Sequence, residues 1–334
     1  MKSISAMGGL FAVVCVAAFA VLGGVTNAGA QTPAATVYPN RPVRLIVPFA
    51  PGGGTDIVAR VIAQKLTEMW GHQVVVDNRG GGGTAIGTEL AVRSAPDGYT
   101  LLLGSTTLSI NPSLRRKLPY DTLKDLEPVS QTAFQAYVLA VHPSVAARDV
   151  KELVALAKAK PETLNYGSPG PGSGSHLAGE LFAMLSGTRL VHVPYKGSAP
   201  ALTDLLGGQI QLIFGTILST YPHVKSGRLR ALGVSSPKRS NVLPDVPSIP
   251  EGGVAGYGAT SWNGVLTPAG VPQAILAKLN ADVVKALQAP DLRERLAADG
   301  GEAVGSSAPE FRAFIQNEIA KWAKVVKAAG LKPE

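Results

Sequence analysis

The sequence has little of what marks disulfide-linked, fibrous or disordered proteins. Of its 334 residues only one is cysteine, 16% are charged and 6% are aromatic. A lone cysteine forms no internal disulfide, so the fold depends on its apolar residues, which make up 46% of the chain. These proportions exclude collagen-like, coiled-coil and disordered chains. At roughly 150 residues per domain, the length favours two domains.

Long apolar runs are scarce as well. Only one approaches the length of a membrane span, and it extends from about Met7 to Val25. Lys2 precedes it and Ala28-Gly29-Ala30 follows it, an order typical of a secretory signal peptide with its cleavage site. We therefore predict that residues 1–30 are a cleaved signal peptide and that the protein is exported. An uncleaved anchor is the alternative, because a bilayer requires about 20 apolar residues.

Basic residues outnumber acidic ones, 31 to 23, but they are spread along the chain. The densest cluster, Arg115-Arg116-Lys117, has no interleaved aromatic residues and precedes Pro119. Nucleic-acid binding typically requires a denser basic patch with aromatic side chains. The sequence therefore predicts no nucleic-acid partner, and the diffuse positive charge favours anionic partners in general.

Strands, glycine-rich loops and helices alternate along the first part of the chain. Residues 43–47 form an apolar run that predicts a buried strand, which ends at a loop rich in proline and glycine. In the helix that follows, apolar residues recur at helical spacing: Val58, Val61, Ile62, Leu66 and Met69. The same order of strand, glycine-rich loop and helix is repeated at 73–76, 80–83 and 84–93. A third strand is predicted at 100–103. This alternation favours a parallel sheet covered by helices on both faces.

A second unit of the same kind follows an apolar strand at 136–141. Its helices are expected over 153–160, 177–185 and 199–206, and its strands at 163–166, 190–194, 210–214 and 229–234. A proline-rich loop covers 237–258, and a strand at 261–266 returns the chain. The helical tail, whose last helix is opened by Ser307 and Glu310 in capping-box spacing, then packs on the first unit. We thus predict two hinged lobes with a cleft between them: 31–133 with 255–334, and 134–254.

Three glycine-rich loops, at 51–54, 80–83 and 167–174, each follow a predicted strand and open a predicted helix. The first backbone N–H groups of a helix have no partner within it, and the helix dipole places positive charge at the same end. Such loops bind anions and, in open α/β sheets, lie at the strand ends where ligands bind. The sequence therefore predicts a site for a small anion.

Nucleotide binding is the main rival for these loops. None of them ends in Gly-Lys-Ser/Thr, so a phosphate-binding loop is excluded. The spacing Gly81-x-Gly83-x-x-x-Gly87 is only loosely similar to the dinucleotide fingerprint, and the next strand ends at Gly104 without an acidic residue for a ribose hydroxyl. We therefore predict no cofactor.

The residues offer no recognisable catalytic or metal centre. Ser173 and Ser175 stand close to His176, but neither serine lies in a Gly-x-Ser-x-Gly elbow, and hydroxyls before a helix suit hydrogen bonding to a carboxylate. Asp56, beside the first loop, is better placed to cap the helix or to brace the loop than to act as a base. The other histidines lack metal-ligand spacing: His72, His142, His192 and His223.

Six motifs, in this order, resemble those of the Bug-type solute-binding proteins, the periplasmic receptors associated with tripartite tricarboxylate transporters. They are Val-Pro-Phe-Ala-Pro-Gly-Gly-Gly-Thr-Asp at 47–56, Asp-Asn-Arg-Gly-Gly-Gly-Gly at 77–83, Asp-Gly-Tyr-Thr-Leu-Leu at 97–102, Ser-His-Leu-Ala-Gly-Glu at 175–180, Val-Pro-Tyr-Lys-Gly at 193–197 and Leu-Pro-Asp-Val-Pro at 243–247. The resemblance covers nearly the whole chain after residue 30.

This resemblance implies an α/β, two-lobed periplasmic binding protein-like fold of type II, without catalytic activity. Such a protein closes on a small carboxylate, presents it to a membrane permease, and is usually a monomer. In the family, first-lobe loops hold one carboxylate through backbone N–H groups and bridging waters, and second-lobe residues set specificity. The implied first-lobe residues are Phe49, Gly52, Gly53, Gly54, Gly83, Thr84, Ala85, Ser105 and Thr106. Those of the second lobe are Ser168, Gly172, Ser173 and His176, with Phe134 and Thr216 at the edge of the cleft.

One position departs from the expected pattern. Phe214 is followed by Gly215, where many relatives are expected to have an aspartate able to receive a ligand ammonium group. We therefore favour a dicarboxylate or an aromatic carboxylate over an amino acid. Two other functions stay open, a ligand-sensing partner of a signalling system and an exported enzyme on the same fold; for the enzyme, only Asp56 and His176 are candidate activated side chains.

Overall fold

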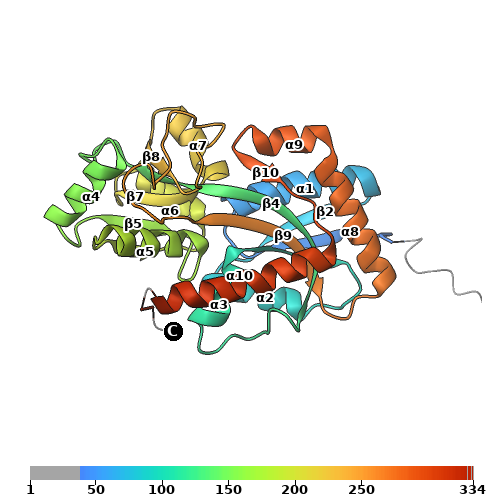
Figure 1. Cartoon of the computed structure of the whole chain (residues 1–334). Coiled ribbons are helices and arrows are strands. Elements are labelled where there is room, and N and C mark those ends of the chain that lie inside the picture. The colour runs from blue at the N-terminus through green and yellow to red at the C-terminus, as the bar shows by residue number, and fades with distance from the viewer. Residues whose placement is uncertain (1–37, 329, 332, 334) are drawn as a thin grey trace, which may run out of the picture. The chain divides into compact units, whose positions relative to one another are not determined.

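The computed structural model describes residues 38–328, 330, 331 and 333 (Figure 1). These residues belong to one compact unit of the chain, Ala34–Glu334. The predicted signal peptide, residues 1–30, lies outside them. Within the described part, no helix combines the length and apolar character that crossing a bilayer requires.

The first half of the sheet has a parallel core of three strands. β1 (Val43–Val47) lies between β2 (Val74–Asn78) and β3 (Thr100–Ser105). β9 (Thr260–Pro268) is antiparallel to β3, β4 (Leu126–Val141) is antiparallel to β9, and β10 (Gly301–Ala303) pairs with β4.

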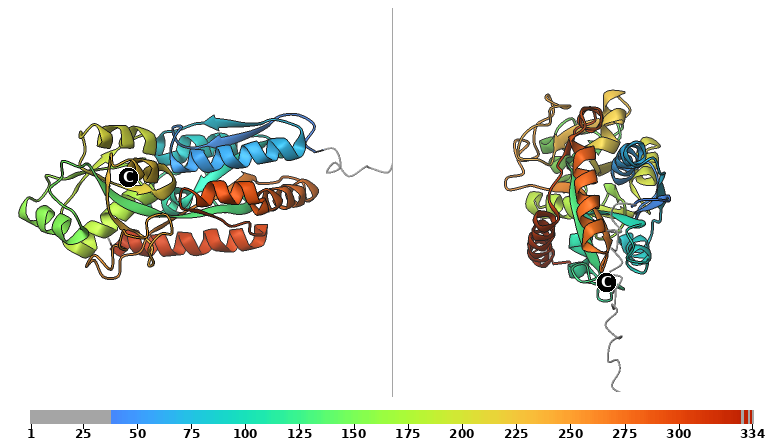
Figure 2. Two further views of the ribbon diagram at one scale, coloured as in Figure 1. Left: turned by 90° about the horizontal axis from the view of Figure 1, so that it is seen from above. Right: turned by 90° about the vertical axis from the view of Figure 1, so that its right-hand side faces the viewer.

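Helices cover both faces of this half because side chains alternate along its strands. Val43, Leu45 and Val47 pack in one cluster with α1 (Gly54–Trp70), α8 (Gln273–Gln288) and α9 (Pro290–Ala297). Ile46 and Leu102 point the other way, toward α2 (Ala85–Val92) and α10 (Ala308–Ala328). Seen from above, α1 and α10 lie on opposite sides of the strands (Figure 2). The C-terminal helices therefore pack on the first half, as predicted.

The second half repeats this layering. Its strand order is β4-β7-β5-β6, with β8 also paired to β4, and the strands are β5 (Asn165–Ser168), β6 (Val191–Pro194), β7 (Leu212–Thr216) and β8 (Arg230–Val234). Leu139 and Phe214 pack toward α4 (Val150–Ala159) and α5 (Gly174–Ser186). Val138 and Ile213 pack toward α6 (Ser198–Leu206) and α7 (Ile217–Lys225).

β4 is common to both halves of the sheet. Its residues from Leu126 to Ala136 pair with β9, whereas those from Tyr137 to Val141 pair with β7 and β8. We call the strands on the β9 side, with their helices, the first half, and those on the β7 side the second half. Whether these halves move as the lobes 31–133 with 255–334 and 134–254 stays a prediction.

Local signals in the sequence account for most of these elements. Ser307 and Glu310 form the predicted capping box, since the Glu310 carboxylate accepts from Ser307 N–H (2.9 Å) and Ser307 Oγ accepts from Glu310 N–H (3.4 Å). Asp149 caps α4 by accepting from Glu152 N–H at 2.8 Å. At α1, the residue that precedes the helix is Gly53, which offers no side-chain cap.

Three elements differ from the sequence prediction. β4 starts at Leu126, ten residues before the predicted strand, because its first part is polar yet buried between β9 and β10. α3 (Thr106–Leu114) was not predicted, because its helical pattern is masked by buried polar residues and an internal Pro112. α7 follows β7 directly and was not predicted, since it also contains a proline, Pro222.

Candidate functional site

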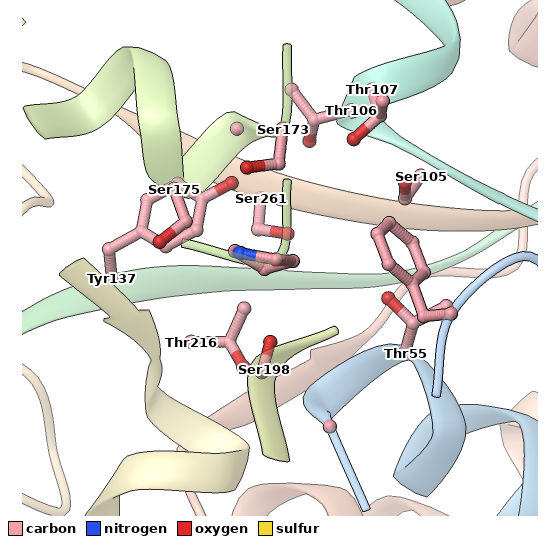
Figure 3. A pocket seen from close by; sticks show the side chains of 14 residues that line it. Thr55, Ser105, Thr106, Thr107, Tyr137, Ser173, Ser175, Ser198, Thr216 and Ser261 are labelled. Atoms are coloured by element: carbon pink, nitrogen blue, oxygen red, sulfur yellow. The ribbon is translucent and has the colours of Figure 1, made fainter. Parts of the chain in front are cut away.

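A small cavity lies where the two halves meet, and its wall is rich in hydroxyl groups (Figure 3). The hydroxyl-bearing residues in the wall are Thr55, Ser105, Thr106, Thr107, Tyr137, Ser173, Ser175, Ser198, Thr216 and Ser261. Phe49, Gly53, Pro169 and Gly174 complete it, so no lining side chain carries a charge. We call this space the inner cavity. Its volume is about 30 Å³, which gives room for roughly two water molecules.

The wall of the inner cavity consists largely of helix N-termini. α1 starts after Gly53, α3 after Ser105, α5 after Ser173, α6 after Gly197 and α7 after Thr216. Each of these helices contributes its preceding residue or its first turn to the wall. Unpaired N–H groups and the positive ends of the helix dipoles therefore converge on one uncharged space, an arrangement that stabilises an anion.

Hydrogen bonds within the protein fix several of these hydroxyls. Thr55 Oγ1 accepts from Asn263 Nδ2 (3.2 Å), and Thr106 Oγ1 accepts from the backbone N–H of Trp262 (3.1 Å). Burial raises the pKa of Tyr137 to about 12, although hydrogen bonds with Ser261 and Thr106 oppose this. Tyr137 is therefore a neutral phenol at physiological pH, and the wall of the inner cavity presents dipoles and no charged side chain.

The two halves touch around the inner cavity, along what we call the seam. The backbone N–H of Ala50 donates to the carbonyl of Lys196 at 3.0 Å. A Cβ on Gly54 would collide with the side chain of Thr216, and one on Gly53 would lie 3.2 Å from Ser198 Cβ. Glycine at 53 and 54 thus permits the close approach of the first loop to α6 and α7. The two halves are thus in close contact around the inner cavity.

Asp56 braces the first loop from behind. Its carboxylate accepts from Gly52 N–H (2.8 Å), Asn78 Nδ2 (2.9 Å) and Arg60 Nε (2.9 Å). Burial alone would raise the pKa of Asp56, but these hydrogen bonds and the charge of Arg60 outweigh it and lower the pKa below its ordinary value. Asp56 is not in the wall of the inner cavity, so it holds the loop and reaches no ligand there.

The residues implied by the family resemblance fall into three groups. Those in the wall of the inner cavity are Phe49, Gly53, Ser105, Thr106, Ser173 and Thr216. Gly52 and Gly54 belong to the same first loop but do not line the cavity. Gly83 and Thr84 line a separate space, the outer cavity, which is described below, and Ala85 is the first residue of α2 behind them.

The third group supports the loop before α5. Ser168 Oγ is hydrogen-bonded to His192 Nε2 (2.6 Å), and Gly172 N–H donates to His176 Nδ1 (3.2 Å). The two imidazole rings stack with centroids 4.0 Å apart. Burial, with a contribution from His176, lowers the pKa of His192 to about 3, so this ring is neutral. Phe134 lies elsewhere, in a space between β4, β10 and residues 236–242.

Some wall residues escaped sequence reasoning. Tyr137 and Ser261 come from β4 and β9, where nothing local marks them as ligand-binding. Ser198 had a signal, since Gly197-Ser198 precedes a predicted helix just as Ser173 precedes α5. A serine or threonine at the start of a predicted helix is therefore a signal that would have identified Ser198.

Gly215 does not face the inner cavity. A Cβ at this position would collide with the side chain of Thr220, and the neighbouring residue, Thr216, is the one in the wall. An aspartate at 215 would therefore meet Thr220 and not a ligand in the inner cavity. The wall of the inner cavity contains no carboxylate that could pair with an ammonium group. Nor do the described residues include a group of three or more His, Cys, Asp or Glu able to hold a metal.

An α/β fold whose inner cavity is formed by helix N-termini on two halves of a sheet defines the class of solute-binding proteins. The sequence profile of the tripartite tricarboxylate transporter family receptors matches residues 58–331, and the chain belongs to this family. It is 40% identical to Protein BugT of Bordetella pertussis over 311 residues, 92% of this chain and 95% of that protein. The chain is thus a Bug-type receptor.

Solved structures show the same fold. The periplasmic binding protein BugD is 35% identical, with a TM-score of 0.86 over 89% of this chain and 100% of that one. Rpa4515 of R. palustris, solved with adipate, is 36% identical, with a TM-score of 0.87 over 89% of this chain and 100% of that one. The type II periplasmic binding protein fold predicted from the sequence is confirmed.

Proposed function

We propose that this protein captures a small carboxylate in the periplasm and delivers it to a permease of the tripartite tricarboxylate type. The observation that carries the proposal is the convergence of the N-termini of α1, α3, α5, α6 and α7 on one uncharged, hydroxyl-lined cavity. A carboxylate has two oxygens, and the inner cavity has room for roughly two water-sized groups. Residues 1–30 would direct export, and the receptor would act as a monomer.

The ligand is a dicarboxylate or an aromatic carboxylate in preference to an amino acid. An ammonium group needs an anionic or carbonyl-rich partner, and the wall of the inner cavity has no carboxylate to supply the charge. The adipate-bound relative supports the same choice. Phe49 adds an apolar surface in the wall for the hydrocarbon part of the ligand.

Binding would work by closure of two lobes, 31–133 with 255–334 and 134–254. β4 and β9 are the strands that connect them, with β4 changing partners between Ala136 and Tyr137. The inner cavity is too small for a whole dicarboxylate to enter while the seam is shut. Separation of the lobes would admit the ligand, and contacts from both lobes would then stabilise the closed state.

Catalysis is not part of the proposal. An enzyme would need an activated nucleophile or a base in the wall of the inner cavity. Asp56 is held by Gly52, Asn78 and Arg60, and His176 lies behind the loop before α5. Neither residue lines the inner cavity.

The first test is thermal unfolding of the purified protein against mono-, di- and tricarboxylates, aromatic acids, amino acids and nucleotides. A ligand at about 100 times its Kd adds about 2.7 kcal/mol, which corresponds to a shift of roughly 4 °C for a protein of about 300 residues. We expect a selective shift with a dicarboxylate or an aromatic acid and no turnover of it. Tighter binding of aspartate or glutamate, or a shift with nucleotides only, would contradict the proposal.

Delivery to a permease is tested in cells. Deletion of this chain should abolish uptake of the acid identified in the first test, and the wild-type gene should restore it. A Gly54→Ala chain, which we expect to bind poorly, serves as the matched control and should not restore uptake. Undiminished uptake in the deletion strain, with loss of a transcriptional response to the acid, would instead favour the sensor function.

A further inference from the structure

A second space, the outer cavity, opens beside the inner one and has a different chemistry. Its volume is about 310 Å³, and it is lined from both halves of the molecule. Gly83, Thr84 and Arg115 belong to the first half, and Pro171, Tyr195 and Lys196 belong to the second. Pro169 is in the wall of both cavities, so the two spaces are neighbours.

The charges around the outer cavity are all positive. Arg115 and Lys196 line it, and no acidic side chain does. Among the described residues, neither cation forms an ion pair with a carboxylate, whereas Arg44, Arg60 and Arg79 each form one. The carboxylate of Asp204 accepts from Tyr195 Oη (2.6 Å) and is not in the wall. Two cations contributed by opposite sides of the seam are thus left to bind an anion.

The size of the inner cavity explains why a ligand would reach this second space. About 30 Å³ holds one carboxylate but not a chain with a second acidic group. In the closed arrangement the remainder of a longer ligand must extend past the wall. Pro169 lines both cavities, and Arg115 and Lys196 line the outer one.

We propose that the outer cavity is an anion subsite in which Arg115 and Lys196 bind the second acidic group of a two-headed ligand, while its first carboxylate occupies the inner cavity. This inference rests on the proposed function and names its substrate class: extended dianions, aliphatic or aromatic. The two heads are recognised by different means, oriented dipoles for the first and mobile cations for the second. Because a cation from each half contacts the same group, the second head also joins the halves.

The test compares two probes that differ by one charge and have nearly the same length, adipate and its monomethyl ester. Their affinities are measured by calorimetry for the wild-type protein and for Arg115→Gln/Lys196→Gln. Arg116→Gln/Lys117→Gln is the control, since both residues are exposed cations outside the wall. We expect the wild-type and control proteins to prefer adipate by tenfold or more, and the Arg115→Gln/Lys196→Gln protein to prefer it by less than threefold.

Ionic strength provides a second readout. Charges at a partly exposed site are screened by salt, whereas the buried dipoles of the inner cavity are not. The preference of the wild-type protein for adipate over its monomethyl ester should therefore shrink between 20 and 300 mM salt, and affinity for the monomethyl ester should stay nearly constant. The preference of the Arg115→Gln/Lys196→Gln protein should not change with salt.

Several results would overturn the inference while leaving the proposed function intact. One is an equal loss of both probes in Arg115→Gln/Lys196→Gln, which would mean that the cations serve closure only. Another is an Arg115→Gln/Lys196→Gln protein that prefers adipate over its monomethyl ester as strongly as the wild type does. A third is inorganic phosphate that binds the wild-type protein, requires Arg115 and Lys196, and does not compete with adipate, because this would show an independent anion site. If the wild-type protein binds neither probe nor any other carboxylate, the proposed function fails and the inference fails with it.

Discussion

The glycine-rich loops at residues 51–54 and 80–83 both follow a parallel strand and both precede a helix, but they approach the seam in different ways. In the first loop, Gly53 is extended (φ −85°, ψ 169°) and α1 starts immediately after it. In the second, Gly81, Gly82, Gly83 and Thr84 all have positive φ, and a short 3₁₀ turn, Gly82–Thr84, comes before α2. The N-terminus of α1 therefore reaches the inner cavity, while the second loop lines the outer one.

The difference shows that glycine runs serve two separate purposes, close approach of the backbone to a neighbour and a backbone conformation with positive φ. In the first loop, glycine gives close approach, because Cβ atoms at 53 and 54 would meet Ser198 and Thr216 across the seam. At Gly82, glycine gives backbone freedom, since φ is 57° and a Cβ there would lie 3.5 Å from the nearest atom. The two roles cannot be distinguished from the glycine content of the loops, but glycine-to-alanine substitutions distinguish them.

The largest effect is expected from Gly54→Ala. The new Cβ would collide with Thr216, so the seam could not shut without a shift of one side chain or loop. Overpacking of this kind costs about 1 to 3 kcal/mol, which corresponds to a loss of ligand affinity of roughly 5-fold to 150-fold by calorimetry. Gly258→Ala is the control, because nothing lies within 4 Å of its Cβ position and its φ is not positive. Affinity within threefold of wild type in Gly54→Ala would show that the seam is loose.

Asp56→Asn should come next, since it weakens the brace behind the first loop. Loss of charged hydrogen bonds to Gly52 and Arg60 is expected to lower the free energy of unfolding by about 2 to 3 kcal/mol in urea titrations at pH 7.

The lowered pKa of Asp56 predicts how this loss of stability depends on pH. The folded-state pKa of Asp56 lies below its unfolded value of about 3.9, so its contribution is complete above about pH 4 and is lost as pH falls through the folded pKa. The difference between wild type and Asp56→Asn should therefore shrink at the lowest pH values. A difference that grows on acidification would contradict the role assigned to the carboxylate.

His192→Gln extends the comparison to the third glycine-rich loop. The folded-state pKa of His192, about 3, lies below the unfolded value of about 6.5, so the unfolded chain binds a proton between these values and the folded protein does not. The stability of the wild type should fall as pH drops below 6.5. The variant lacks this titration and should gain stability relative to wild type from pH 7.5 to pH 5 in urea unfolding. Parallel profiles would show that folding does not lower the pKa of His192.

The smallest effect is expected from Gly82→Ala. A non-glycine residue at positive φ costs roughly 1 kcal/mol, and the nearest atoms leave room for the methyl group. Thermal unfolding should detect this loss, while affinity for a monocarboxylate should stay within twofold of wild type. A large loss of affinity here would place the second loop in the inner cavity after all.

The sequence identified elements whose signals are local. The strand at 43–47 was predicted with its observed bounds because an apolar run ends at Pro48. The start of β4 and the helix at 106–114 were not, because Gln131, Thr132 and Asn111 are polar yet buried by tertiary contacts that no local pattern encodes.

Some residues of the candidate site were anticipated from the sequence and others were not. Ser105, Ser173 and Thr216 were implied by the family resemblance, and the structure places each of them directly before a helix and in the wall of the inner cavity. Tyr137 and Ser261 were missed, since they reach the inner cavity only through the pairing of β4 with β9 and β7. Gly83 and Thr84 were implied to hold the same carboxylate as the first loop; the structure places them in the wall of the outer cavity together with Arg115, and their role in binding stays a prediction.

The C-terminal helix gives the protein a built-in optical probe. Trp322 and Val326 of α10 pack with Ile110 and Leu114 of the first half and with Leu177 of the second. The other two tryptophans, Trp70 and Trp262, pack within the first half. Indole emission shifts to longer wavelengths as water replaces apolar neighbours, so separating the halves should change the fluorescence of Trp322 alone. Ligand capture can then be followed in real time without any label.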